Sequence, residues 1–297
     1  MSALALGPAV MFTPADRPER YAKALERADA VILDLEDAVT PDARPAARDG
    51  VRAAWEGRAA GGADGGPLDV ARVVVRVNPA GGADHAADLA MLAETGWRTV
   101  MLAKAESAAQ VDGLVAALGE DVRVVALCET AAGVLAAAEL AAHPNVGALM
   151  WGAEDLVASM GGSSSRTADG AYRSVVTHAR AAVLLAAAAH GAAAWDAVHL
   201  DLADEAGLAA EAEDAVALGC AATVCLHPRQ VPVVRSAYTP AAEAVERAHR
   251  VLAEAEGRHG AFELDGAMVD EVVLAQARAV LRRAEAAGAE AAGAAAG

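Results

Sequence analysis

Residues 123–130 are Arg-Val-Val-Ala-Leu-Cys-Glu-Thr, a short apolar run that ends in a carboxylate. A run that is continuously apolar, rather than alternating, is typical of a parallel strand buried on both faces. Seven similar runs occur along the chain, and the eight together are Ala9–Pro14, Ala30–Leu35, Arg72–Asn78, Thr99–Lys104, Arg123–Cys128, Val146–Trp151, Trp195–Leu200 and Ala222–Leu226. The sequence therefore predicts eight buried strands.

Longer alanine-rich segments with helical character separate these runs. They are Arg17–Ala28, Ala83–Glu94, Ser107–Leu118, Ala131–Ala142, Ala171–His190 and Ala203–Leu218. Eight successive strand–helix units are the pattern of a closed (β/α)8 TIM barrel. A doubly wound open sheet is the alternative, but the regular units lack the glycine fingerprint of a dinucleotide-binding fold, which favours the barrel.

The C-terminal part of the chain extends beyond what barrel closure requires. We expect the barrel to occupy residues 1–237 and a helical extension to occupy 238–286, with Thr239-Pro240 at the start of a helix and a segment Phe262–Met268 that opens another. The extension would cap the site or reach a neighbouring subunit. Residues 287–297 are Ala, Gly and Glu only, which predicts a disordered tail.

Composition excludes two classes of partner. The chain has 24 Lys and Arg against 41 Asp and Glu, a net charge of −17, and only 3% aromatic residues, which argues against nucleic acid and against an anionic membrane surface. An anionic substrate would need a local basic pocket. The three cysteines have no metal-ligand spacing and are expected to be buried thiols, and no segment is apolar enough to span a bilayer, so we expect a soluble, cytoplasmic protein.

Ionisable and polar residues follow nearly every predicted strand. They are Asp34, Glu36, Asp37, Arg76, Asn78, Lys104, Glu106, Glu129, Thr130, Glu154, Asp155, His199, Asp201 and His227. Barrel enzymes build their sites at the carboxyl ends of the strands, so these residues should converge on one rim. A structural network of ion pairs would explain single members, whereas so large a convergence indicates a functional site.

Glu129 and Asp155 are the candidates for a metal site. Two carboxylates completed by water and substrate oxygens suit Mg²⁺. The alternatives are structural: Glu129 could belong to a helix start formed with Thr130, and Asp155 could stabilise the first turn of a helix. Arg76, which follows a run of valines, could bind a carboxylate or stabilise an enolate oxygen, or it could pair with acidic neighbours at the end of the second run.

Ordered motifs along almost the whole chain resemble one known family. They are Phe12-Thr-Pro-Ala-Asp-Arg-Pro-Glu-Arg20, Asp34-Leu-Glu-Asp-Ala-Val39, Arg76-Val-Asn78, Cys128-Glu-Thr-Ala-Ala-Gly133, Gly152-Ala-Glu-Asp-Leu156, His227-Pro-Arg-Gln230 and Asp265-Gly-Ala-Met-Val-Asp270. The set resembles the citrate lyase β-subunit-like branch of the HpcH/HpaI aldolase/citrate lyase family. The chain departs from the family's usual pattern before the eighth run, where it has Gly219-Cys-Ala-Ala-Thr223.

The resemblance implies a homotrimer or hexamer that binds Mg²⁺ through Glu129 and Asp155. It further implies that Arg76 contacts the substrate and that Asp270, supplied by an adjacent subunit, acts as an acid/base. Glu36 and Asp37 would orient Arg76 and metal-bound water. The basic residues Arg17, Arg20 and Lys23 would bind the CoA phosphates, although Lys23 could equally belong to a solvated helix face.

The activity implied by this resemblance is a Mg²⁺-dependent carbon–carbon lyase. It would cleave or form a 3-hydroxyacyl-CoA thioester of the malyl-CoA or citramalyl-CoA type, with an acyl-CoA and a 2-keto acid as the partners. Three alternatives remain open at the level of sequence: a malyl-CoA-type thioesterase, a class II aldolase acting on free 2-keto acids, and a non-catalytic barrel subunit.

Overall fold

The computed structural model describes residues 3–57, 68–258 and 260–296, which form two compact units. The first unit comprises residues 1–234 and the second residues 235–297. The division lies close to the boundary that we expected after residue 237. Each unit has its own apolar core.

The first unit is a closed barrel of eight strands in chain order, and every neighbouring pair is parallel. The ring closes where β1 pairs with β8, through Ala9 with Thr223 and Val10 with Val224. The strands are β1 (Ala9–Pro14), β2 (Ala30–Asp34), β3 (Val73–Val77), β4 (Thr99–Leu102), β5 (Arg123–Cys128), β6 (Val146–Trp151), β7 (Ala193–Asp196) and β8 (Ala222–Cys225). The predicted TIM barrel is confirmed.

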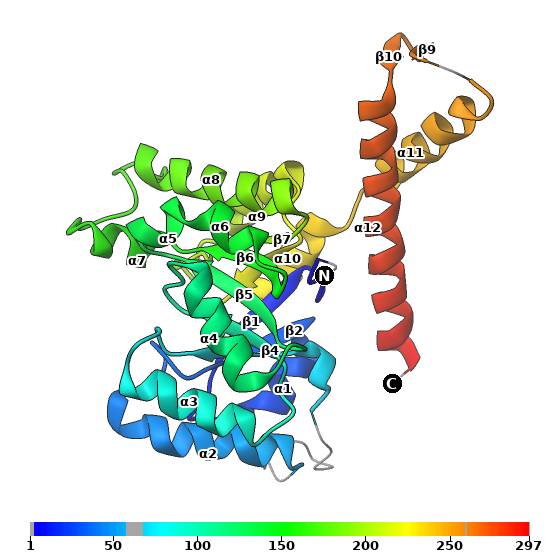
Figure 1. The fold of residues 1–297 in the computed structure, drawn as a ribbon. Helices are drawn as coiled ribbons and strands as arrows, with labels where there is room; N and C mark the ends of the chain where they lie inside the picture. Colours follow the sequence, from blue (N-terminus) through cyan, green and yellow to red (C-terminus); the bar gives the residue numbers. More distant parts are fainter. Residues whose placement is uncertain (1–2, 58–67, 259, 297) are drawn as a thin grey trace. The chain divides into compact units, whose positions relative to one another are not determined.

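Helices follow the strands and lie outside the ring (Figure 1). They are α1 (Tyr21–Arg27), α2 (Arg44–Trp55), α3 (Ala83–Ala93), α4 (Ala108–Leu118), α5 (Ala131–Leu135), α6 (Ala137–Ala142), α7 (Ala153–Ser159), α8 (Ser174–His190), α9 (Glu205–Leu218) and α10 (Gln230–Tyr238), with short 3-10 turns η1 (Pro18–Arg20), η2 (Pro41–Ala43) and η3 (Val70–Arg72). The helical segments named from the sequence did not include α2 or α10, and α7 was anticipated only as a helix whose first turn contains Asp155. Helix α2 begins after Pro41 and buries Ala47, Val51 and Ala54.

The seventh strand differs most from its predicted range. It covers Ala193–Asp196 rather than Trp195–Leu200, and it pairs with β6 through Ala193 and Ala194. Alanine has weak strand propensity, so sequence alone gave no signal for these two positions. They are small enough to pack in the crowded ring beside Trp195, which is fully buried. As a result, His199 lies in the loop after the strand.

The interior of the barrel is filled by side chains that alternate along the strands. They include Val10, Ile32, Val74, Met101, Val125, Leu127, Ala148, Met150, Trp195 and Val224. Because side chains on a strand point alternately to opposite faces, the residue two positions after an interior residue also points inward. Asp34 follows Ile32 in this way, Arg76 follows Val74, and Glu129 follows Leu127. The barrel periodicity thus directs these three charges toward the axis.

The second unit contains α11 (Ala242–Ala255), β9 (Phe262–Leu264), β10 (Ala267–Val269) and α12 (Glu271–Ala296). Its core includes Ala248, Val251, Val269 and Ala277. The segment expected to open a helix is instead an antiparallel hairpin, whose turn residues Asp265 and Gly266 both have positive φ, 52° and 76°. Both values match the two-residue hairpin turns that fit the twist of paired strands.

Helix α12 extends to Ala296, through most of the segment for which we expected disorder. The disordered tail expected for residues 287–297 stays a prediction, and residue 297 lies outside the described residues. Alanine and glutamate are strong helix formers, and here their local preference continues the packed helix.

All three cysteines are buried and free, as the sequence predicted. In the part of the chain that the structure describes, every helix is too short or too polar to cross a lipid bilayer.

Candidate active site

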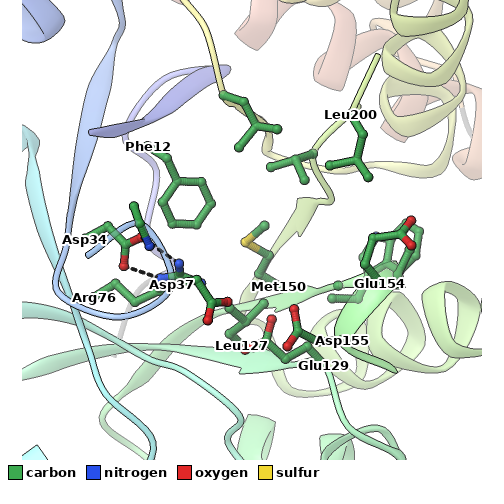
Figure 2. Close-up of a pocket in the computed structure, with 16 residues that line it drawn as sticks. Phe12, Asp34, Asp37, Arg76, Leu127, Glu129, Met150, Glu154, Asp155 and Leu200 are labelled. Carbon is green, nitrogen blue, oxygen red and sulfur yellow. Dashed lines mark hydrogen bonds and ion pairs between the residues drawn. The ribbon is translucent and has the colours of Figure 1, made fainter. Parts of the chain in front are cut away.

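A cavity of about 340 Å³ lies at the carboxyl ends of the barrel strands (Figure 2). One part of its wall is charged and the other is apolar. The charged residues are Asp34, Asp37, Arg76, Glu129, Glu154 and Asp155. The apolar residues include Phe12, Leu127, Met150, Val198, Leu200 and Leu226. Leu127 and Met150 also belong to the barrel core, so the floor of this cavity is the upper layer of that core.

Arg76 is fixed in the cavity wall by two carboxylates. Its Nε and Nη2 donate to the two oxygens of Asp34 at 2.6 and 2.7 Å, and its Nη1 lies 3.0 Å from Glu36 Oε2. The guanidinium also lies 4.6 Å from the centre of the Phe12 ring. Burial opposes the charge of Arg76, but Asp34 and Glu36 outweigh it and raise the arginine pKa. Arg76 is therefore a permanent, immobile cation.

Asp34 is the anchor of this arrangement. Beyond the bidentate pair with Arg76, its oxygens accept hydrogen bonds from the backbone N–H groups of Glu36 and Ala38, each at 3.0 Å. Together the four contacts hold both oxygens of the Asp34 side chain in one orientation. Strand pairing explains the geometry, because Asp34 and Arg76 are direct partners in the β2–β3 register.

Lys104 reaches three carboxylates from the end of β4. Its Nζ lies 2.5 Å from Glu36 Oε1, 3.2 Å from Asp155 Oδ1 and 3.9 Å from Glu129 Oε1. Burial tends to lower the lysine pKa, but the hydrogen bond to Glu36 and the charge of Glu129 outweigh burial, and the net effect is a raised pKa. Lys104 therefore stays protonated.

Glu129 and Asp155 lie next to each other at the ends of β5 and β6 (Figure 2). Glu129 is buried, whereas the side chain of Asp155 is 35% exposed. Burial, together with the charge of Asp155, raises the pKa of Glu129 to about 8. A Cβ at position 152 would lie 2.9 Å from the Cβ of Glu129, so Gly152 provides the space that Glu129 occupies.

The structure assigns the helix cap after β5 to Thr130 and not to Glu129. The N-cap of α5 is Thr130, whose Oγ1 accepts the N–H of Gly133 at 3.0 Å. The carboxylate of Glu129 instead accepts the backbone N–H of Lys104 at 3.1 Å and faces the cavity. Asp155 does lie in the first turn of α7, where the helix dipole favours a negative charge, and it lines the same cavity.

The charges around this cavity do not balance. In the ion-paired cluster, two cations, Arg76 and Lys104, contact four carboxylates, Asp34, Glu36, Glu129 and Asp155, and the carboxylates of Asp37 and Glu154 line the cavity outside this cluster. With every group ionised, the cluster would carry two excess negative charges. Buried charges of one sign are costly without a counter-charge, so the cluster favours an added cation.

A second cavity of about 540 Å³ adjoins the first, since Phe12 and Leu226 line both. Its wall carries the basic side chains of Arg20, Lys23 and Arg27, together with His227. Arg17 does not line this cavity; its exposed side chain lies 3.9 Å from Asp16. The structure thus places two of the three predicted basic residues at one cavity.

Some predicted rim residues have structural partners instead. Asn78 donates to the carbonyl of Leu35 at 2.9 Å and to Asp88 at 2.8 Å, which ties β3 to its neighbours. His199 is buried and its Nδ1 lies 2.9 Å from Glu211. These residues support the rim without lining the cavity.

Asp37 and Asp270 occupy different surroundings. Asp37 is exposed and lines the acidic cavity, whereas Arg76 pairs with Asp34 and Glu36. Asp270 belongs to the second unit, where it caps α12: its Oδ1 accepts the N–H groups of Val272 and Val273 at 3.0 and 3.2 Å.

Sequence reasoning assigned no role to two residues that organise the site. Asp34, rather than Asp37, holds Arg76, and the signal was its position two residues after the interior Ile32. Lys104 was noted only as a polar residue at a strand end. Its approach to Glu36 depends on a backbone conformation that the sequence does not reveal.

The fold and the site together define a class of protein. Its members are (β/α)8 barrels with a carboxylate-rich, negatively charged site at the carboxyl ends of the strands. The sequence profile described as HpcH/HpaI aldolase/citrate lyase matches residues 9–228. The chain belongs to this family.

Individual relatives agree with this assignment. The chain is 54% identical over 285 residues to a citrate lyase subunit beta-like protein of Mycobacterium tuberculosis, covering 96% of this chain and 98% of the relative. It is 35% identical over 283 residues to a (3S)-malyl-CoA thioesterase of Cereibacter sphaeroides, covering 93% and 94%. A crystal structure of protein CitE from M. tuberculosis, in complex with magnesium, acetoacetate and coenzyme A, superposes with a TM-score of 0.85 at 53% identity, covering 95% and 99% of the two chains.

The raised pKa of Glu129 predicts a pH-dependent stability of the metal-free protein. Between 4.5, its ordinary value, and about 8, the folded protein keeps a proton on Glu129 that the unfolded chain has lost. The stabilisation from this group is complete below pH 4.5 and is lost as pH rises toward 8, by up to about 1.4 kcal/mol per pH unit. Relative to the Glu129→Gln variant, the wild-type free energy of unfolding should fall from pH 6 to pH 8.

Urea unfolding in the presence of a chelator measures this difference. Glu213→Gln, at an exposed position on α9, is the matched control and should follow the wild-type pH dependence. Parallel curves for wild type and Glu129→Gln would contradict the prediction.

Proposed function

We propose that this protein is a Mg²⁺-dependent carbon–carbon lyase that cleaves or forms a 3-hydroxyacyl-CoA thioester of the malyl-CoA or citramalyl-CoA type. One observation carries the proposal: a cavity with an excess of buried carboxylates adjoins a cavity lined by basic side chains. The first suits a divalent cation and an oxygen-rich acid, and the second suits the phosphates of coenzyme A.

The residues at the acidic cavity fit Mg²⁺. Within the described ranges there is no cluster of three or more His, Cys, Asp or Glu side chains suited to hold a metal, which leaves the pair Glu129 and Asp155. Mg²⁺ is commonly bound by one or two carboxylates and completes its shell with water and substrate oxygens. The solved CitE structure contains magnesium, which supports the same metal here. When bound, the ion would act as a Lewis acid toward the keto-acid carbonyl.

Arg76 is suited to bind the reacting end of the substrate. A guanidinium has five N–H donors, and the contacts with Asp34 and Glu36 use three of its nitrogens without using every donor. The remaining donors can face a ligand carboxylate or the thioester oxygen in the cavity. Since Asp34 and Phe12 hold the guanidinium in place, little reorganisation is needed as negative charge develops on that oxygen.

The two cavities provide a path for a long ligand. Phe12 and Leu226 line both, so an extended thioester could place its acyl end near Glu129 and its phosphates near Arg20 and Lys23. The relative described as a malyl-CoA thioesterase and the CitE structure with coenzyme A support a CoA ester rather than a free acid.

In the condensation direction, we assign Asp270 as the base that removes a proton from the α-carbon of the acyl thioester. The resulting carbanion forms the new carbon–carbon bond with the keto carbon, and the electrons of the broken C=O π bond move to the keto oxygen. Arg76 offsets the negative charge that develops, and the oxygen takes a proton from solvent to become the 3-hydroxyl group. Cleavage is the reverse, with Asp270 returning the proton. Glu36 holds Arg76 in position, and Asp37 is placed to contact metal-bound water.

We further propose a homotrimer or hexamer in which Asp270 serves the site of a neighbouring subunit. Met268 and Val272, which flank Asp270 on β10 and α12, are exposed apolar side chains. Exposed apolar groups beside a candidate acid/base are expected where another subunit covers them.

Hydrolysis is the second candidate reaction, supported by the relative described as a malyl-CoA thioesterase. The same site would then direct water at the thioester carbonyl. The two reactions differ in products, because hydrolysis releases free thiol without a 2-keto acid, whereas cleavage releases a 2-keto acid and leaves the new acyl group on coenzyme A.

Purified protein with Mg²⁺ should cleave malyl-CoA or citramalyl-CoA and release a 2-keto acid. Glu129→Gln and Asp155→Asn should each reduce this turnover at least about 100-fold, because each removes a ligand of the essential metal. Thiol and keto-acid release are measured separately, together with the melting temperature of each variant. Glu213→Gln is the control, and full activity of either ligand variant would contradict the metal assignment.

Arg20→Ala and Lys23→Ala should raise KM for the CoA ester about fivefold each, equivalent to about 1 kcal/mol for a partly exposed ion pair, and leave kcat nearly unchanged. Steady-state kinetics over a range of ester concentrations test this. Arg247→Ala, at an exposed position on α11, is the charge-matched control. An equal rise in KM for the control would show that the effect is only long-range electrostatics.

Asp270→Asn should lose turnover but still bind acyl-CoA, since asparagine keeps the helix-capping function and lacks the acid/base. If Asp270 serves a neighbouring site, mixing Asp270→Asn with Glu129→Gln, each inactive alone, should restore about one quarter of the sites after subunit exchange. Activity measured after co-refolding tests this. An inactive mixture of properly assembled oligomers would place Asp270 in its own subunit's site.

A further inference from the structure

The ammonium group of Lys104 lies close to both candidate metal ligands, Glu129 and Asp155. It lies 3.2 Å from Asp155 Oδ1 and 3.9 Å from Glu129 Oε1, while its shortest contact, at 2.5 Å, is with Glu36 Oε1. The side chain thus bridges carboxylates that follow three different strands. In the metal-free protein, it is the cation that faces both candidate metal ligands.

Lys104 has an unusual backbone conformation at the point where its side chain reaches these carboxylates. Alternation along β4 would direct Ala103 inward after the interior Met101, and Lys104 outward. Lys104 instead has φ of 50°, in the left-handed region that is unfavourable for a residue with a side chain. Its N–H donates to Glu129 Oε1 at 3.1 Å, so backbone and ammonium both contact the same carboxylate.

Two other roles for a lysine at a barrel rim fit less well. A Schiff-base nucleophile must be a neutral amine, whereas the contacts with Glu36 and Asp155 stabilise the ammonium form. A purely structural ion pair with Glu36 would not require the approach to Asp155 or the left-handed backbone.

We propose that Lys104 is a resident counter-cation of the metal site: it holds Glu129 and Asp155 in place when the metal is absent, and when a divalent cation enters it gives up these two contacts and keeps its contact with Glu36. This inference rests on the proposed metal site. Glu36 gives the ammonium a second partner, so the lysine need not be expelled into solvent. Metal affinity is then set by competition between the divalent cation and Lys104 for the same two carboxylates.

The proposal predicts in which direction the affinity for a divalent cation changes when the Lys104 ammonium is removed. Removing the ammonium leaves the two carboxylates with a greater excess of negative charge, which strengthens divalent binding and destabilises the metal-free protein. A residue that only oriented the metal ligands would have the opposite effect, because its loss would weaken metal binding.

Direct titration with Mg²⁺ by calorimetry, without substrate, tests the proposal. Lys104→Met removes the charge and keeps much of the side-chain length. Lys104→Asn removes the charge and tolerates the left-handed backbone, so it covers the case in which the methionine variant fails to fold. Both should lower the Kd for Mg²⁺ at least about tenfold, and the gain in melting temperature on saturation with Mg²⁺ should be larger than for wild type.

Lys104→Arg, which keeps the charge, should bind Mg²⁺ more weakly than either uncharged variant. An unchanged or raised Kd in the folded uncharged variants, with Mg²⁺ binding by wild type intact and lost in Glu129→Gln, would overturn the role of Lys104 alone. A wild-type protein that binds no Mg²⁺ would overturn both this inference and the proposed metal site.

Discussion

The bidentate pair between Arg76 and Asp34 is the interaction on which the rest of the site depends. Both groups are buried, and removing one partner of such a pair is expected to cost about 3–5 kcal/mol because the other charge is left uncompensated. Asp34 also binds two backbone N–H groups of the following loop. The pair therefore fixes three things together: the loop after β2, the guanidinium that faces the cavity and, through Glu36, the position of the Lys104 ammonium.

The barrel itself generates this concentration of charge. Parallel strands in a closed ring present their carboxyl ends at one rim, and alternation brings the residue after each interior position toward the axis. Apolar side chains fill the interior as far as Leu127 and Met150, and the next inward positions on β2, β3 and β5 are the charged residues Asp34, Arg76 and Glu129. The same geometry that builds a dry core thus builds an acidic cavity directly above it. Asp34, Glu36 and Glu129 are buried where they lie against this core.

This geometry also explains which parts were predictable from sequence. The ranges Ala9–Pro14, Arg123–Cys128 and Val146–Trp151 were predicted residue for residue, because continuous apolar runs with polar ends mark buried strands. The alanine-rich start of β7 and the hairpin at Phe262–Val269 were not, since tertiary packing and turn geometry decide them. In the site, rim residues could be located from their strand ends, but the choice of Asp34 as partner of Arg76 depends on strand register. The position of the Lys104 ammonium depends on a left-handed backbone that no residue type signals.

A net charge of −17 repels an anionic thioester, so its binding requires local fields of the opposite sign. In the proposed function, Arg76 would offer its remaining N–H donors to the acyl end at a first point, and at a second point the group containing Arg20 and Lys23 would supply such a field for the phosphates. Between these points, Phe12 and Leu226 offer an apolar passage that suits the uncharged middle of such a ligand. A free hydroxy-keto acid could use only the first point. In the proposed function, the second cavity would add affinity only for a substrate long enough to reach it, so specificity for a coenzyme A ester would depend on a region distant from the reacting bond.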